Sequence, residues 1–127
     1  MPQTNGIKKI VLFDDDPTMR TLLETLLGME GFSAKAYIEK QGDDFVEFVR
    51  AEKPDAVLLD VHLTYSSGVD LLTEIRSDEQ LKDMHVLMTS GMDMKAICLQ
   101  AGADGFLLKP YMPDELISWL HEIFKQN

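Results

Sequence analysis

Short apolar runs alternate along the chain with longer segments in which apolar residues recur every three or four positions. The continuous runs are typical of strands buried on both faces, and the periodic segments are typical of helices with one apolar face. The pattern predicts five strands, at residues 9–13, 32–37, 56–59, 85–88 and 105–108, of which the second is the weakest. It also predicts five helices. The first begins at Pro17 and the last at Pro113, and the three between them cover residues 43–52, 68–76 and 92–100. Such alternation favours an α/β fold in which helices cover both faces of a parallel sheet.

Local signals indicate where the first and last helices begin and end. Asp16 is a suitable N-cap residue because Pro17 follows it at the first helical position, and Gly31 is expected to end this helix. Pro113 begins the last helix, and the acidic residues that follow it favour the positive end of the helix dipole. We therefore interpret Asp16 first as a helix cap.

Polar residues of chemical interest follow four of the five apolar runs. Ligands of such sheets bind beyond the carboxyl ends of the strands, where the strand order reverses. The candidates at these ends are Asp14, Asp15, Asp16, Asp60, Thr89, Ser90 and Lys109. Two carboxylates about 5 Å apart repel each other by roughly 3 kcal/mol at an effective dielectric of about 20, and one lysine offsets only part of this. A divalent cation would offset the rest, and an all-oxygen shell suits Mg²⁺.

The segment VLFDDDPT, at residues 11–18, permits two interpretations. Asp14 could be a nucleophile with Asp16 as its acid/base partner, in the D-x-D-x-T spacing of small phosphatases of the haloacid dehalogenase type. Alternatively, the acidic residues hold a metal ion and the nucleophile lies elsewhere. Against the first interpretation, the sequence lacks the late acidic pair that holds the metal in those phosphatases, since Asp104 stands alone. That interpretation also gives Asp60 no role.

Taken in order, the strand ends resemble the receiver domain of two-component response regulators over nearly the whole chain. The matching motifs are Asp14-Asp15, Asp60, Ser90-Gly91 and Lys109-Pro110, with Arg20 and Gly68 at their usual places. The resemblance implies a flavodoxin-like fold with strand order 2-1-3-4-5 and a single receiver domain over residues 1–127. It also implies a cis peptide bond before Pro110.

The resemblance assigns Asp60 as the phosphoacceptor. Asp60 would attack the phosphorus of a phosphohistidine on a sensor histidine kinase or phosphotransfer protein and form an acyl phosphate. Lys109 would contact one phosphoryl oxygen and Ser90 another. Thr89 competes with Ser90 for this role, but Gly91 after Ser90 leaves room for the phosphoryl group. The domain would be regulatory and not an enzyme, apart from its own phosphotransfer and autodephosphorylation.

The resemblance also implies the Mg²⁺ ligands and the switch. Asp15, the Asp60 carboxylate and the backbone carbonyl of His62 would hold Mg²⁺, with Asp14 acting mainly through water. Phosphorylation would let Phe106 repack and would alter the surface formed by helix four, strand five and helix five, which a downstream effector would read. The side chain of His62 would be free to lean over the site.

Two departures from the family pattern stand out. Thr64 replaces the proline that often lies four residues after the acceptor, so this loop is expected to be less rigid. Only 19 positions separate Ser90 from Lys109, which is nearly one helical turn short in the region of helix four. These departures keep open a third interpretation, a receiver-like binding module that is not phosphorylated.

Composition narrows the location and the partners. A net charge of −10 is unsuited to a nucleic-acid partner. No apolar run approaches the roughly 20 residues of a membrane span, and the first residues lack the apolar core of a signal peptide. The single Cys98 is expected to be a buried, inert thiol and fits a reducing cytoplasm. Trp119 is expected to pack partly into the core.

Overall fold

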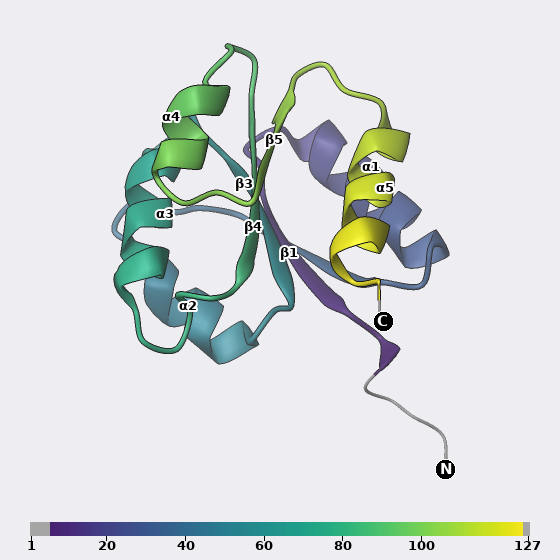
Figure 1. Cartoon of the computed structure of the whole chain (residues 1–127), viewed down its shortest axis with the longest axis horizontal. Helices are drawn as coiled ribbons and strands as arrows, with labels where there is room; N and C mark the ends of the chain where they lie inside the picture. Colours follow the sequence, from purple (N-terminus) through teal and green to yellow (C-terminus); the bar gives the residue numbers. More distant parts are fainter. Residues whose placement is uncertain (1–5, 126–127) are drawn as a thin grey trace.

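The computed structural model describes residues 6–125 and has a parallel sheet at its centre (Figure 1). The strands are β1 (Lys9–Phe13), β2 (Ser33–Tyr37), β3 (Ala56–Asp60), β4 (His85–Ser90) and β5 (Gly105–Leu108). The helices are α1 (Pro17–Met29), α2 (Phe45–Glu52), α3 (Gly68–Ser77), α4 (Lys95–Gln100) and α5 (Pro113–Ile123). The strand order is β2-β1-β3-β4-β5 and all neighbouring strands are parallel. The predicted fold class and strand order are confirmed.

Alternating side chains of the central strand β1 enter two separate cores. Val11 and Phe13 pack in the core beneath α2, α3 and α4, whereas Ile10 and Leu12 pack in the core beneath α1 and α5. Successive side chains of a strand point to opposite faces of the sheet, so a continuous apolar run needs helices on both sides. Figure 1 shows this arrangement, with α2, α3 and α4 on one face and α1 and α5 on the other.

Helix α1 begins and ends where its local signals indicate. The Asp16 carboxylate accepts a hydrogen bond from the Thr18 N–H at 2.9 Å, and Pro17 occupies the first turn. Gly31 has a φ of 95°, a conformation that suits a residue without a side chain just after a helix. The prediction that Asp16 is the N-cap is confirmed.

Helix α4 is shorter than the periodicity predicts. It begins at Lys95 and not at residue 92, and it contains six residues. Strand β4 continues to Ser90, which pairs with Leu108 of β5, and the Ser90 hydroxyl oxygen accepts from the Met92 N–H, so residues 92–94 remain a loop. The N-cap residue, Met94, makes no capping hydrogen bond through its side chain. The short spacing between Ser90 and Lys109 therefore reduces α4.

Cys98 and Trp119 occupy the places that their patterns predict. Cys98 is fully buried in the core under α4, and burial raises the pKa of its thiol. Trp119 is half-buried against β5, since a Cβ added at Gly105 would lie 2.6 Å from the indole nitrogen. No helix within residues 6–125 combines the length and the apolar character needed to cross a membrane.

The strand order reverses next to β1. The chain runs from β1 to β2 on one side and then returns to place β3 on the other side, where Phe13 pairs with Leu59. The carboxyl ends of β1 and β3 therefore lie side by side. In open α/β sheets this is the place where ligands bind.

Gly68, the first residue of α3, lies unusually close to the end of β3. A Cβ at this position would lie 2.2 Å from the backbone oxygen of Asp60 and 2.9 Å from the Cα of Val61. The Gly68 N–H also donates a 2.7 Å hydrogen bond to the Val61 carbonyl. Only a residue without a side chain lets α3 begin this close to Asp60.

Replacing Gly68 with alanine is expected to lower the free energy of unfolding by about 3 kcal/mol, because the clash is with backbone that cannot move aside. Gly28→Ala is the matched control. Gly28 lies in α1 with no atom within 4 Å of an added Cβ, so alanine there should raise stability by about 0.5 kcal/mol through helix propensity. Urea denaturation of the two variants measures both effects, and equal stabilities would contradict the close approach.

Candidate functional site

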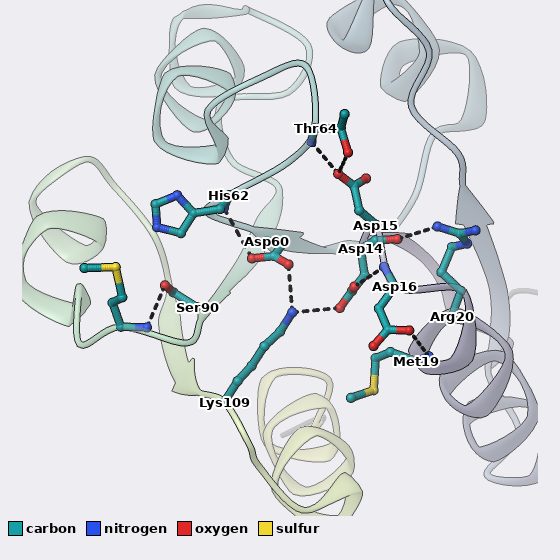
Figure 2. Close-up of polar contacts among 11 residues, drawn as sticks. Asp14, Asp15, Asp16, Met19, Arg20, Asp60, His62, Thr64, Ser90 and Lys109 are labelled. Carbon is teal, nitrogen blue, oxygen red and sulfur yellow. Dashed lines mark hydrogen bonds and ion pairs between the residues drawn. The ribbon is translucent and has the colours of Figure 1, made fainter.

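Three charged side chains from three strand ends meet at the reversal of strand order (Figure 2). Asp14 follows β1, Asp60 is the last residue of β3, and Lys109 follows β5. The Lys109 ammonium lies 2.7 Å from Asp60 Oδ2 and 3.1 Å from Asp14 Oδ2. Asp14 is only 3% exposed and Asp60 8%. The structure therefore brings together the residues that sequence reasoning placed at three separate strand ends.

This group carries an excess of negative charge. Burial raises the pKa of Asp60 above its ordinary value; the Lys109 ammonium partly offsets this, and the neighbouring Asp14 adds to it. Burial alone would lower the pKa of Lys109, but the hydrogen bonds to Asp60 and Asp14 outweigh it and hold that pKa above its usual range. Two buried carboxylates thus share one ammonium, which leaves one negative charge without a partner in this group.

The loop after β1 is held by hydrogen bonds around Asp14. Asp14 Oδ1 accepts from the Asp16 N–H at 2.9 Å, and the Asp14 backbone carbonyl accepts from Arg20 Nη1 at 2.9 Å. Both donors come from the start of α1, which the Asp16 cap itself begins. Arg20 therefore orients the backbone of Asp14 and does not reach the carboxylates.

Asp15 lies apart from the Asp14–Lys109–Asp60 group. Its Oδ2 accepts hydrogen bonds from both the N–H and the hydroxyl of Thr64, in the loop between β3 and α3. Figure 2 shows the carboxylate directed at that loop. The sequence singled out Thr64 only as a departure from the family pattern, and its contact with Asp15 was not foreseen.

The expected metal ligands are not gathered into one cluster. Among the residues that the structure describes, no three acidic, histidine or cysteine side chains are arranged to hold a metal ion. The donor chemistry nevertheless suits a hard cation, because buried Asp14 and Asp60 offer carboxylate oxygens and have a single ammonium between them. The residues therefore fit Mg²⁺ in charge and atom type, while Asp15 is engaged elsewhere.

A buried hydroxyl beside this group lacks a partner. Tyr111 is 8% exposed, and within residues 6–125 its hydroxyl makes no hydrogen bond. Burial raises its pKa, and the charges of Asp14 and Asp60 raise it further. A water molecule or a hydrated cation near these carboxylates would satisfy this hydroxyl. Tyr111 was missed from sequence because its position, two residues after Lys109, looks like ordinary core.

Ser90 and Thr89 are both fully buried at the end of β4. The Ser90 hydroxyl oxygen accepts a 3.0 Å hydrogen bond from the Met92 N–H, and the Ser90 carbonyl accepts from the Lys109 N–H at 2.8 Å. Thr89 pairs with Asp60 in the sheet register. Ser90 is thus tied to both the loop before α4 and the backbone of Lys109.

His62 and Phe106 lie at the margin of the site. The His62 N–H donates a 3.3 Å hydrogen bond to Asp60 Oδ1, while its imidazole is exposed. Phe106, on β5, is half-buried against the core under α2, α3 and α4. The peptide bond between Lys109 and Pro110 is cis, as the resemblance implies.

A doubly wound parallel sheet with an acidic pair and a lysine at its switch point defines the class of the receiver fold. The chain matches the family model described as the response regulator receiver domain over residues 10–121, and it belongs to that family.

Solved structures support this assignment. The BeF3-activated N-terminal receiver domain of RstA from Klebsiella pneumoniae is 30% identical and has a TM-score of 0.78, with 93% of this chain and 99% of that one covered. A putative response regulator from Chloroflexus aurantiacus is 28% identical, with a TM-score of 0.83 and coverage of 94% and 99%.

Among curated proteins, the DNA-binding response regulator MtrA of Mycolicibacterium smegmatis is 30% identical over 120 residues, which are 94% of this chain and 52% of MtrA. The chain therefore spans about half the length of this relative.

Asp60→Asn is expected to raise the free energy of unfolding at pH 7 in the absence of metal. Because the folded-state pKa of Asp60 lies above its unfolded value, ionising Asp60 costs stability. This cost is absent below about pH 3.9 and complete above the folded-state pKa. The gain should therefore fade as the pH falls. Chemical denaturation across pH measures it, with Asp16→Asn, an exposed cap change, as control. A loss of stability at pH 7 would show that the Lys109 pairing outweighs the burial of Asp60.

Tyr111→Phe is expected to raise the free energy of unfolding by about 1 kcal/mol, because it removes a buried hydroxyl that has no partner. Tyr37→Phe is the matched control, since the Tyr37 hydroxyl donates to Asp43, and it should lower stability by about 1 kcal/mol. Thermal unfolding in a metal-free buffer compares the two. A destabilised Tyr111→Phe variant would mean that the hydroxyl is hydrogen-bonded in solution.

Proposed function

We propose that this receiver domain accepts a phosphoryl group on Asp60 from a phosphohistidine of a sensor histidine kinase or phosphotransfer protein. The observation that carries the proposal is the environment of the Asp60 carboxylate. Its Oδ2 is 2.7 Å from the Lys109 ammonium, and its Oδ1 accepts from the His62 N–H. The carboxylate is thus held at the carboxyl edge of the sheet, next to the Lys109 ammonium, which can neutralise charge on a phosphoryl oxygen.

The transfer exchanges one bond to phosphorus for another. A carboxylate oxygen of Asp60 attacks the phosphorus, the new P–O bond forms as the P–N bond breaks, and the imidazole of the partner leaves with the electron pair and takes up a proton. The product is an acyl phosphate. The Lys109 ammonium, which already contacts Asp60, would then form an ion pair with a negatively charged phosphoryl oxygen.

The balance of charge supports a requirement for Mg²⁺. Before transfer, two carboxylates face one ammonium; afterwards Asp60 carries a phosphoryl group of about −1.5 to −2 charges. Mg²⁺ bound by Asp15, the Asp60 carboxylate and the His62 carbonyl, with Asp14 through water, would supply the missing positive charge. The fit of the donors at Asp14 and Asp60 supports this part of the proposal.

Movement of Ser90 toward the phosphoryl group is the proposed start of the switch. The Ser90 O–H would donate to a phosphoryl oxygen while the hydroxyl oxygen keeps accepting from the Met92 N–H, which would draw the loop before α4 inward. Two features support this movement: α4 has only six residues, and its N-cap makes no side-chain hydrogen bond. A helix end with few hydrogen bonds opens at low cost. Phe106 would repack into the space that the loop vacates.

The α4–β5–α5 face is the proposed surface for a downstream effector. It exposes large apolar side chains near the site, at Met92, Leu108 and Met112. The net charge of −10 disfavours direct contact of this domain with nucleic acid. We place the domain in the cytoplasm, with no membrane contact, and regard it as one regulatory receiver unit and not as an enzyme. The free thiol of Cys98 agrees with that compartment.

The phosphatase interpretation has less support. Asp16, its proposed acid/base, is an exposed residue whose carboxylate caps α1. With Asp14 as the nucleophile, Asp60 would have no role, although it lies at the same edge of the sheet and contacts Lys109 at 2.7 Å.

Incubation with a small phosphodonor and Mg²⁺, followed by intact-mass spectrometry, tests the proposed function. Wild type is expected to gain one phosphoryl group and Asp60→Asn none. Asp16→Asn is the matched control: asparagine also caps helices, so labelling should equal wild type.

The other outcomes separate the alternatives. Labelling of Asp60→Asn together with no labelling of Asp14→Asn would make Asp14 the nucleophile, as in the phosphatase interpretation. No labelling of wild type would leave a binding module that is not phosphorylated.

A further inference from the structure

The loop between β3 and α3 contacts Asp15 through a single residue. Thr64 donates both its backbone N–H and its hydroxyl to the same oxygen, Asp15 Oδ2 (Figure 2). Hydrogen bonds to a carboxylate are about twice as strong as those between neutral groups. Two such donors on one oxygen make this the strongest polar contact that Asp15 has in the structure.

The same loop is held from a second side. Glu39 accepts from the Tyr65 N–H at 2.9 Å and from the Ser66 hydroxyl. At the base of the loop, His62 forms an isolated bridge with Ser67. The donors of Thr64 are therefore presented by an ordered loop, although the loop lacks a proline. In place of a proline, hydrogen bonds to Asp15 and Glu39, which lie in two other loops, restrict the conformation of the β3–α3 loop.

Holding Asp15 in this way has a consequence for metal binding. A cation that takes Asp15 Oδ2 as a ligand must compete with both donors of Thr64. Asp14 and Asp60, in contrast, are already gathered by Lys109. The described residues contain no ready cluster of three metal-binding side chains, and the Thr64 contact is what directs Asp15 to the loop.

We propose that Thr64 is a positioning residue that withholds Asp15 from Mg²⁺ and so weakens the affinity of this receiver for the ion. The inference rests on the proposed function, because it concerns the same Mg²⁺ site and describes how that site is regulated. Ligation of Mg²⁺ through Asp15 Oδ2 then requires the Thr64–Asp15 contact to open. The occupancy of the site, and with it the phosphorylation of Asp60, becomes sensitive to the concentration of Mg²⁺.

Two substitutions of Thr64 remove the donors in steps. Thr64→Val keeps the shape and the N–H but loses the hydroxyl, whereas Thr64→Pro loses both donors. We expect Mg²⁺ to bind about 5-fold more tightly to the first and about 20-fold more tightly to the second, in proportion to the charge-assisted hydrogen bonds that no longer compete. Thr64→Ser keeps both the N–H and the hydroxyl as donors, so its affinity for Mg²⁺ is expected to equal that of wild type.

Ser66→Ala is the matched control for a general loosening of the loop. It removes the hydroxyl contact with Glu39 but leaves Thr64 on Asp15. A purely structural effect of the loop would change Mg²⁺ affinity in this variant as much as in Thr64→Val. We expect its affinity to equal wild type.

Isothermal titration with MgCl₂ measures the affinity of each variant, and the rise in melting temperature with Mg²⁺ gives a second readout. The backbone amide signal of Thr64 in wild type should also move during the titration, with the same dissociation constant. Tighter binding in the order wild type, Thr64→Val, Thr64→Pro supports the proposal. Equal or weaker binding by Thr64→Val overturns it, since Thr64 would then be neutral or would present Asp15 to the ion.

The outcome is separable from that of the proposed function. If Asp60 is phosphorylated in a Mg²⁺-dependent manner but all variants bind Mg²⁺ equally, only the role of Thr64 is wrong. If neither wild type nor any Thr64 variant binds Mg²⁺, the role of Thr64 and the metal site both fall.

Discussion

The Lys109 ammonium lies between two buried carboxylates, and the rest of the site depends on this contact. Asp14 and Asp60 end neighbouring strands and would repel each other in a poorly solvated edge of the sheet. Lys109, which follows β5, lies 3.1 Å from Asp14 Oδ2 and 2.7 Å from Asp60 Oδ2. It therefore joins the ends of three strands and leaves the site one positive charge short. That shortage of positive charge supports the proposal that the site binds a cation.

The neighbouring acids Asp14 and Asp15 lie just after the end of β1, where the chain bends at Asp15, and they have different environments. Asp14 points to the buried group around Lys109, whereas Asp15 points to the loop that carries Thr64. The acidic pair is therefore divided between the buried group around Lys109 and the hydrogen-bonded loop between β3 and α3. Binding of both acids to one ion would require a local rearrangement, and the energy of that rearrangement would contribute to the proposed affinity for the ion.

Local signals in the sequence explain why most of the strands and helices could be predicted. Strand β1 is continuous and apolar because both of its faces are buried, and Asp16 with Pro17 begins α1 through hydrogen bonds within a few residues. The predicted start of α4 was wrong because Ser90, held in β4 by its pairing with β5, accepts a hydrogen bond from the Met92 N–H, and residues 92–94 remain a loop. The Tyr111 hydroxyl, which makes no hydrogen bond within residues 6–125, was missed for a similar reason: the burial of Tyr111 comes from packing against segments distant in the sequence.

The sequence by itself determined the alternation of strands and helices and the residue types at the strand ends, since both depend on periodicity and on nearest neighbours. Those residue types, through their resemblance to a family, also indicated the roles that the site residues are proposed to have. The tertiary structure alone decided which side chains meet: Lys109 on Asp14 and Asp60, Thr64 on Asp15, and Glu39 on the β3–α3 loop. Each of these contacts joins residues at least 26 positions apart. The packing of the sheet and its helices sets the geometry of these contacts. Local patterns in the sequence carry no information about that packing.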